Sequence, residues 1–203
     1  MKVFVTGGSG YLGGHLIRRL VAEGHEVTGH ARSEGSAARV RALGVRTVTA
    51  PLTAEAPLLE ALRGHDAVVH AAAHFALWGP WRLFQEGVID ATLALHRAAA
   101  SADVPRFVYI SAAGVVSGNL PPVVDEGTPY PRRHTAFYAQ AKALTETALR
   151  YEPEGGNNDR DLASAAHLGR GDAGTGAVRG RRPGGPHRLG GRRAAHPRHG
   201  ARG

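Results

Sequence analysis

Two side chains with acid–base chemistry, Tyr138 and Lys142, lie four residues apart in a segment predicted to be helical from about Thr135 to Tyr151. Residues at this spacing share one face of a helix, one turn from each other. A phenol normally loses its proton near pH 10, and a neighbouring ammonium group lowers that pKa because it favours the phenolate. The pair therefore predicts a tyrosine that acts as an acid or base near neutral pH, beside a lysine able to hydrogen-bond ribose hydroxyls.

A second group of residues, at the start of the chain, suits the binding of a dinucleotide. Gly7, Gly8, Gly10 and Gly13 follow the apolar run Val3–Val5 and precede residues with helical apolar spacing. In the order strand, glycine turn, helix, such glycines allow a tight turn and a close approach of the backbone to a pyrophosphate. The start of the helix then offers free N–H groups and a partial positive charge to the phosphates.

Five predicted strands alternate with helices and must bring these two groups together. This order predicts an α/β fold, a Rossmann-type doubly wound parallel sheet with right-handed crossovers, in which ligands bind at the carboxyl ends of the strands. The predicted strands are 3–5, 26–31, 45–50, 66–72 and 106–111, and the predicted helices are 12–21, 36–43, 55–63, 84–98 and 135–151.

The end of the second predicted strand bears on the choice of cofactor. An acidic residue at this point takes the ribose hydroxyls of NAD, whereas an arginine accommodates the 2′-phosphate of NADP. The strand ends without Asp or Glu, and Arg32 follows it. Arg32 therefore favours NADP, unless it is simply an exposed loop residue.

The end of the fourth predicted strand leaves two alternatives open. Small residues there, Ala71 and Ala72, let a cofactor lie across the strand end, and His70 is either catalytic or a packed strand-end histidine. Trp78 and Trp81, the only tryptophans of the chain, follow directly. They either line the mouth of a substrate site or plug the start of the next helix.

The composition limits the class of protein. A chain of 203 residues suits one domain with a sizeable core, or one domain and a tail. The absence of cysteine excludes disulfides and thiolate metal sites, and we expect no metal. Because no apolar run approaches the roughly 20 residues that span a bilayer, and the N-terminus does not fit a signal peptide, we expect a cytoplasmic protein without a membrane partner.

Four motifs, Thr6-Gly-Gly-Ser-Gly-Tyr-Leu-Gly13, His70-Ala-Ala72, Phe107-Val-Tyr-Ile-Ser111 and Tyr138-Ala-Gln-Ala-Lys142, together resemble the extended short-chain dehydrogenase/reductase family. That family includes sugar-nucleotide epimerases and dehydratases, dihydroflavonol-type reductases and 3β-hydroxysteroid dehydrogenase-like proteins. The resemblance covers residues 1 to about 152. It implies an enzyme that exchanges hydride between NAD(P) and a hydroxyl or carbonyl group of a sugar nucleotide, a steroid-like or a flavonol-like molecule. Members of the family often form homodimers, so a homodimer is a possible assembly.

The resemblance also implies roles for single residues. Tyr138 is the acid or base, Lys142 is its partner, and Ser111 hydrogen-bonds the substrate oxygen. The expected cofactor-binding residues are Gly7, Gly10, Tyr11, Leu12, Gly13, Arg32, Ala71, Ala72 and Lys142.

Three departures from the family pattern bear on activity. Ala112 and Ala113 follow Ser111 where the family often has further Ser or Thr residues, so the catalytic serine is Ser111, is shifted to another position, or is missing. The stretch Ala50–Leu52 replaces an acidic residue that contacts adenine, and Gly87 stands where the family usually has Asn. A non-catalytic NAD(P)-binding sensor is therefore the alternative function.

From Gly155 onward the composition changes to Gly, Arg, Ala, Pro and His. Ten Arg and three Asp after residue 156 carry +7 of the net charge of +8, so the preceding 156 residues carry only +1. Arg-Gly-rich segments can bind nucleic acid as disordered arms. A nucleic-acid binder would thus rest on residues 155–203 alone, and we expect no such partner.

The resembled family continues after the lysine helix with a sixth strand, an Arg-Pro pair, a Trp-Gly turn and a substrate-binding lobe. Back-translation from Asn157 with GC-rich codons, read one base later, permits T-M-T-V-T-S-R-P-P-H-I-W-G-A-G, which has the features of that strand and turn. We therefore interpret residues 1–154 as the nucleotide-binding domain and residues 155–203 as a disordered, frameshift-derived tail. Without the sixth strand and the lobe, the edge of strand five is expected to be exposed and activity impaired.

Resequencing the gene tests this interpretation. We expect a one-base shift near codon 155 to open a frame that continues into a substrate-binding lobe. A gene whose shifted frame meets a stop codon, or encodes no such lobe, contradicts the frameshift.

Overall fold

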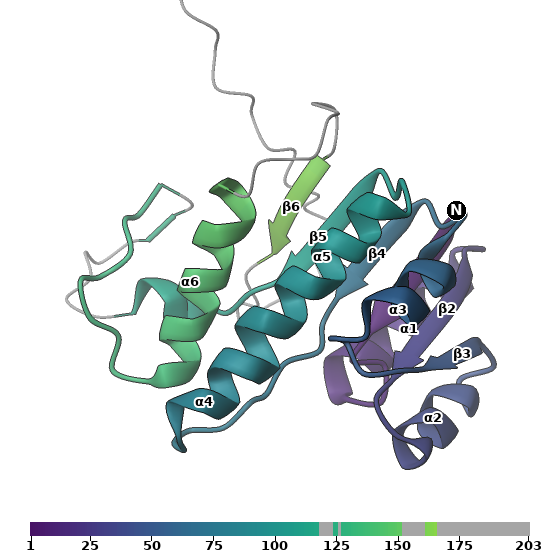
Figure 1. Ribbon diagram of the computed structural model, residues 1–203, viewed down its shortest axis with the longest axis horizontal. Coiled ribbons are helices and arrows are strands. Elements are labelled where there is room, and N and C mark those ends of the chain that lie inside the picture. Colours follow the sequence, from purple (N-terminus) through teal and green to yellow (C-terminus); the bar gives the residue numbers. More distant parts are fainter. Residues whose placement is uncertain (118–123, 126, 152–160, 166–203) are drawn as a thin grey trace, which may run out of the picture. The chain divides into compact units, whose positions relative to one another are not determined.

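Six parallel strands form one sheet in the order β3-β2-β1-β4-β5-β6 (Figure 1). The computed structural model describes residues 1–117, 124–125, 127–151 and 161–165, all within the first of two compact units, residues 1–172. The strands are β1 (Lys2–Thr6), β2 (Glu26–Ala31), β3 (Arg46–Thr49), β4 (Ala67–His70), β5 (Arg106–Ile110) and β6 (Asp161–Ala165). The predicted doubly wound parallel sheet is confirmed for its first five strands.

The expectation that the sixth strand is missing is wrong. β6 pairs in parallel with β5, from Arg106 opposite Asp161 to Ile110 opposite Ala165. A strand ladder is made by main-chain N–H and C=O groups, so a segment without apolar periodicity can still complete it. The edge of β5 is therefore paired, and the expected aggregation site is not open there. The other residues of the predicted tail, 155–160 and 166–203, lie outside the described residues.

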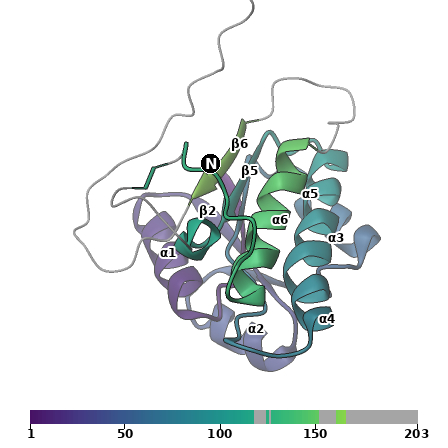
Figure 2. The ribbon, with the colours of Figure 1, turned by 90° about the vertical axis from the view of Figure 1, so that its left-hand side faces the viewer.

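Helices connect the strands and cover both faces of the sheet. They are α1 (Tyr11–Ala22), α2 (Glu34–Arg41), α3 (Glu55–Leu62), α4 (Trp81–Phe84), the π-helix η1 (Gln85–Asp90), α5 (Ala91–Ser101), the 3₁₀ turn η2 (Ala113–Val116) and α6 (Phe137–Tyr151). Figure 2 shows α1 on one side of the strands and α3, α5 and α6 on the other. None of the helices in the described ranges is long and apolar enough to cross a membrane.

Alternating side chains of β1 divide the core into two layers. Val3 and Val5 face the layer that α1 closes with the fully buried Ile17. Phe4 points to the other face, where α5 contributes the fully buried Leu95. A central parallel strand buried on both faces is expected to be continuously apolar, which is why the short run at the chain start forms the middle of the sheet.

The long helix predicted over residues 84–98 is continuous but irregular. Its apolar positions are buried as the spacing predicts, with Phe84 and Leu95 fully covered. Between them the backbone widens into η1, which directly follows α4 and precedes α5. Such π-helical turns inside α-helices often occur at functional sites.

Candidate active site

The glycine turn after β1 is packed against the end of β4. Gly7 has a positive φ of 76°, and a Cβ on it would lie 2.7 Å from the carbonyl carbon of Ala71. A Cβ on Gly13 would lie 2.2 Å from the Gly7 carbonyl oxygen. Both distances are shorter than any real contact, so only glycine lets the turn, α1 and β4 come together in this way.

Gly10 has a different environment. It is the residue before α1, its N–H donates to the Gly7 carbonyl oxygen at 3.0 Å, and no side chain caps the helix. A Cβ on Gly10 would meet only the Gly7 oxygen, at 3.3 Å. The N–H groups of the first turn of α1 have no partner within the helix, so this open end is suited to an anion. Tyr11 is exposed beside it, and Leu12 lines the pocket described below.

Arg32 is exposed directly after β2. The next residue, Ser33, caps α2 through a reciprocal pair of hydrogen bonds with Ser36. The first carboxylate after β2, that of Glu34, accepts a hydrogen bond from Arg41 at 2.7 Å. That carboxylate is therefore already engaged by a guanidinium of the same helix.

His70 is a structural residue, which settles the first alternative left open by the sequence. Its side chain is 1% exposed and lies between two threonines, with Nδ1 2.6 Å from Thr6 Oγ1 and Nε2 2.9 Å from Thr92 Oγ1. The Thr92 hydroxyl donates to the Val88 carbonyl oxygen, so it accepts from Nε2–H, and Nδ1 accepts from Thr6. Burial lowers the pKa of His70 to about 3, so the ring stays neutral and ties β1 and β4 to α5.

One pocket of about 260 Å³ brings the predicted catalytic residues together. Ser111, Tyr138 and Lys142 all line it. The remaining lining residues come from α1, from the segment after β4 and from the end of β5: Leu12, Ala71, Phe75, Ile110 and Ala112. The pocket thus lies where the glycine turn meets the carboxyl ends of β4 and β5.

Lys142 is the central cation of this pocket. Its side chain is 2% exposed, and Nζ donates to the Ile110 carbonyl oxygen at 2.7 Å. The same nitrogen lies 4.3 Å from the centroid of the Tyr109 ring. Burial lowers the pKa of Lys142 to about 8, against the opposing field of Glu146, so the ammonium form is held much less firmly than in water.

The pKa of Tyr138 shifts in the direction opposite to the one expected from the sequence. The sequence predicts a tyrosine whose pKa is lowered by Lys142, but burial instead raises the pKa of Tyr138. Lys142 Nζ is 5.8 Å from the Tyr138 ring centroid and is hydrogen-bonded to Ile110, so its charge does not overcome the loss of water around the phenol. The Phe75 ring contributes to that burial, edge-on to the Tyr138 ring at 5.0 Å.

Ser111 has a buried hydroxyl that is not satisfied within the described residues. The residue is 3% exposed, and its Oγ has no hydrogen-bond partner there. Leaving such a group unpaired costs ~1–3 kcal/mol. Because the same residue lines the pocket, a ligand oxygen bound beside Tyr138 is a natural partner for this hydroxyl.

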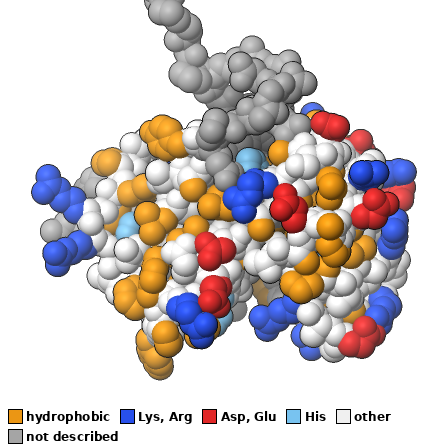
Figure 3. Space-filling view, in the orientation of Figure 1, with side chains coloured by type: hydrophobic (Ala, Val, Ile, Leu, Met, Phe, Trp, Pro, Cys, Tyr) orange, Lys and Arg blue, Asp and Glu red, His pale blue; other side chains and the backbone are white. Residues whose placement is uncertain are grey.

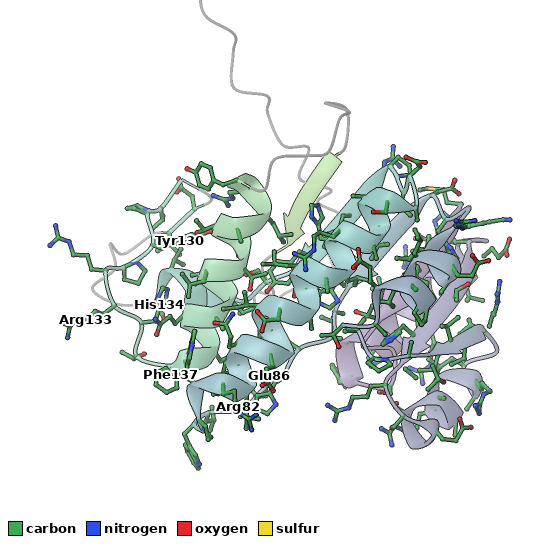
Figure 4. All side chains as sticks on the ribbon, viewed as in Figure 1. Arg82, Glu86, Tyr130, Arg133, His134 and Phe137 are labelled. Atoms are coloured by element: carbon green, nitrogen blue, oxygen red, sulfur yellow. The ribbon has the colours of Figure 1, made fainter. Side chains whose placement is uncertain are left out.

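Glu146 is a site-supporting residue that the sequence analysis missed. It lies one turn beyond Lys142 on α6, is 6% exposed, and accepts a hydrogen bond from Tyr130, which lies on the segment before α6 (Figure 4). Arg150 is 3.5 Å from the same carboxylate oxygen. The spacing of four residues from Tyr138 to Lys142, Glu146 and Arg150 was the available signal.

Each of the two tryptophans fits one of the two roles that the sequence left open, the mouth of a substrate site or a plug at the start of the helix. Trp78 is 81% exposed after β4, as expected for the mouth of a site. Trp81, the first residue of α4, packs against the buried cluster that contains Phe84, and its ring lies 5.5 Å from the Phe137 ring, as expected for a plug. Phe75 was missed, although its place three residues after Ala72 could have suggested it.

Comparison with known proteins yields a family match over most of the chain. The model of the NAD dependent epimerase/dehydratase family matches residues 3–162. A 4-hydroxy-2-methyl-3-oxo-4-farnesyl-3,4-dihydroquinoline-1-oxide ketoreductase of Stigmatella aurantiaca is 37% identical over 147 residues, which is 72% of this chain and 44% of the relative. A decarboxylating sterol-4-alpha-carboxylate 3-dehydrogenase of Dictyostelium discoideum is 34% identical over 155 residues, which is 73% of this chain and 47% of the relative.

A similar solved structure is a UDP-glucose-4-epimerase from Stenotrophomonas maltophila with bound NAD and formylated UDP-arabinopyranose. Its TM-score is 0.69 at 26% identity, and the match covers 81% of this chain and 52% of that one. The chain thus spans about half the length of the relatives that it matches.

Replacement of Lys142 by Met tests the burial of its charge. The unfolded chain keeps the Lys142 proton up to a pKa of 10.5, whereas the folded chain releases it at about 8. Between these values the unfolded state binds more protons, so the stability of the parent protein rises with pH. The stability of Lys142→Met relative to the parent should therefore fall by ~2 kcal/mol from pH 7 to pH 9.5.

Urea unfolding of both proteins at the two pH values measures this difference, and other titrating groups cancel in the comparison. Leu144→Met, an exposed position on the same helix, is the control and should show no such pH dependence. If the difference in unfolding free energy between Lys142→Met and the parent is the same at both pH values, the ammonium group of Lys142 is not buried as described.

Proposed function

Because the chain belongs to the NAD dependent epimerase/dehydratase family, we propose that it carries the hydride-transfer site of a nicotinamide-dependent oxidoreductase. Its substrate is the hydroxyl or carbonyl group of a small molecule. The observation that carries the proposal is a single pocket lined by Ser111, Tyr138 and Lys142 beside the glycine turn. NAD-dependent epimerases, dehydratases, reductases and dehydrogenases are the homologues of this chain.

The residues around the glycine turn fit a dinucleotide. Gly7 and Gly13 hold the turn tightly on β4, while the space at Gly10 stays open before the free N–H groups of α1. Leu12 and Ala71 then line the way to the pocket. When bound there, the nicotinamide supplies or accepts the hydride.

Tyr138 acts as the proton donor to a carbonyl oxygen. Since burial raises its pKa, the phenol keeps its proton at neutral pH, which suits reduction of a ketone more than oxidation of an alcohol. The Ser111 hydroxyl hydrogen-bonds the same oxygen and orients it. Lys142, held on the Ile110 carbonyl, stabilises the phenolate that remains after proton transfer and has further N–H donors for the ribose.

Arg32 favours NADP over NAD in this proposal. Its guanidinium is exposed at the end of β2, while the Glu34 carboxylate that follows is engaged by Arg41. An available guanidinium suits a 2′-phosphate, and a free carboxylate at this point would repel it. The similar epimerase structure contains NAD, so the preference for NADP is a property proposed for this chain alone.

A non-catalytic nucleotide sensor is the second candidate function. Ala112 and Ala113 remove the later hydroxyl groups of the family pattern, so this function follows if Ser111 does not orient the substrate. We also predict that turnover by this chain is impaired, that it forms a homodimer and that it is located in the cytoplasm.

Substitution of Gly10 and Arg32 tests the nucleotide site. Gly10→Asp should weaken NADPH binding at least tenfold because its carboxylate repels the pyrophosphate, while the thermal midpoint stays equal or rises, since Asp is a favourable residue before a helix. Arg32→Ala should weaken NADPH about tenfold and leave NADH unchanged. Isothermal titration calorimetry measures both.

Arg39→Ala is the matched control, because it removes an exposed guanidinium from α2 at another position. NADPH binding that survives Gly10→Asp contradicts the assignment of the glycine turn and the start of α1 to the pyrophosphate. An equal loss of NADH and NADPH in Arg32→Ala contradicts the preference for the 2′-phosphate.

Tyr138→Phe tests catalysis separately from binding. Removal of the phenolic proton should lower hydride transfer by about 10²–10⁴-fold and leave NADPH affinity within about twofold. Oxidation of NADPH followed at 340 nm with a ketone substrate measures the rate, and Tyr151→Phe, an exposed tyrosine at the far end of α6, is the control. Turnover that persists in Tyr138→Phe contradicts the proton-donor role, and nucleotide binding without any turnover in the parent supports the sensor.

A further inference from the structure

Three large apolar side chains are exposed on the segment between β4 and α4. They are Phe75 (71% exposed), Leu77 (70%) and Trp78 (81%), which we call the apolar rim. Such exposed groups, when they lie together, usually mark a binding surface. In Figure 3 hydrophobic side chains crowd the lower left end of the molecule, where Figure 1 shows α4.

The apolar rim is continuous with the pocket. Phe75 itself lines the pocket, and its ring meets the ring of Tyr138 edge-on at 5.0 Å. A ligand whose reacting oxygen lies beside Tyr138 therefore has Phe75 as its next neighbour. Leu77 and Trp78 follow within three residues of the chain.

The base of the rim is firmly held. The Phe137 ring contacts the rings of both Trp81, at 5.5 Å, and Phe84, at 6.0 Å. The His74 N–H donates to the Gly87 carbonyl oxygen at 3.1 Å, and a Cβ on Gly87 would lie only 2.6 Å from His74 Cβ. Glycine in place of the family's usual asparagine thus lets the segment before the rim lie directly on η1.

The pocket, as the described residues form it, does not enclose a large substrate entirely. Its volume of about 260 Å³ is below the roughly 300–1,000 Å³ of pockets that enclose drug-sized ligands. Only the reacting end of a larger molecule can enter beside Tyr138 and Ser111. The rest of that molecule must lie outside the pocket, where Phe75 is the adjoining surface.

Among the described residues, those that line the pocket include one cation, Lys142, and no arginine. Arg82, on α4, lies 3.4 Å from the Glu86 carboxylate, does not line the pocket, and is largely exposed. Arg133, on the segment before α6, is exposed and points away from the helices (Figure 4). A sugar nucleotide needs cations directed at its phosphates, whereas the rim offers rings and an aliphatic chain.

Resting on the hydride-transfer function proposed above, we propose that the site takes a bulky apolar ketone, of steroid or isoprenoid type, whose hydrocarbon part lies on Phe75, Leu77 and Trp78. On this proposal the site does not bind a sugar nucleotide. The printed names of two relatives, a farnesyl-dihydroquinoline ketoreductase and a sterol dehydrogenase, agree with this class.

The two tryptophans of the chain provide a direct assay, since Trp78 belongs to the rim and Trp81 lies in its base. The full chain, with and without saturating NADPH, is titrated with androst-4-ene-3,17-dione and, separately, with UDP-glucose while tryptophan fluorescence is recorded. The steroid should change the emission of Trp78 and Trp81 saturably, and UDP-glucose should not. Phe75→Ser/Leu77→Ser, which keeps both tryptophans, should weaken steroid binding about tenfold.

Tyr151→Ser is the matched control, because this tyrosine is 80% exposed and lies about 20 Å from Tyr138 along α6. It should bind the steroid as the parent does, and melting curves verify that both variants fold. UDP-glucose binding without steroid binding, or equal steroid affinity in the rim variant and the parent, overturns the proposal. So do tryptophans that acrylamide cannot quench without ligand, since the rim is then covered by other residues.

Failure of the two proposals can be told apart. Absence of NADPH binding in calorimetry removes the hydride-transfer function, whatever the rim binds. Normal NADPH binding together with no steroid binding overturns the apolar substrate class and leaves the nucleotide site intact.

Discussion

The burial of one ammonium group, that of Lys142, is the constraint on which the arrangement of the site depends. Its Nζ reaches the Ile110 carbonyl at the end of β5 and lies over the Tyr109 ring, so α6 must lie against this end of the sheet. Tyr138, one helical turn earlier, is thereby brought to the pocket that Ser111 lines. Burial of the Lys142 ammonium group lowers the stability of the fold, because the charged group loses its water. Its presence in the pocket therefore points to a role in function and not in folding.

A second, neutral network holds the opposite side of the pocket. His70 joins Thr6 at the end of β1 to Thr92 on α5, and Thr6 also accepts a hydrogen bond from the Ala72 N–H. The glycine turn and the end of β4 are therefore fixed to each other before any ligand arrives. Fully satisfied buried networks of this kind make a structure rigid, which is the condition for holding a cofactor and a proton donor at a fixed distance.

Patterns in the sequence were sufficient for the first five strands, the glycine turn and the place of Tyr138 and Lys142. Periodicity and glycine spacing are local properties, and a parallel sheet leaves few ways to join such elements. The shift of the Tyr138 pKa was predicted in the wrong direction, because it depends on the hydrogen bond of Lys142 to Ile110 and on the Phe75 ring. These contacts join distant parts of the chain and have no local signal.

The sixth strand was missed for a related reason, since β6 is recognised by its main-chain pairing with β5 and not by its side chains. The roles of His70 and of the two tryptophans needed the same three-dimensional information. An apolar rim beside a small polar pocket likewise appears only when the exposure of Phe75, Leu77 and Trp78 is known.

The most direct test of the buried ammonium group is a titration of its own signal. The chain contains two lysines, Lys2 and Lys142, so ¹³C-lysine labelling gives two ε-carbon resonances, which Lys142→Met assigns. We predict that the Lys142 resonance titrates with a pKa of about 8. A Lys142 resonance that titrates near 10.4, the ordinary value for lysine in water, would mean that the ammonium is hydrated and would contradict the account of the site.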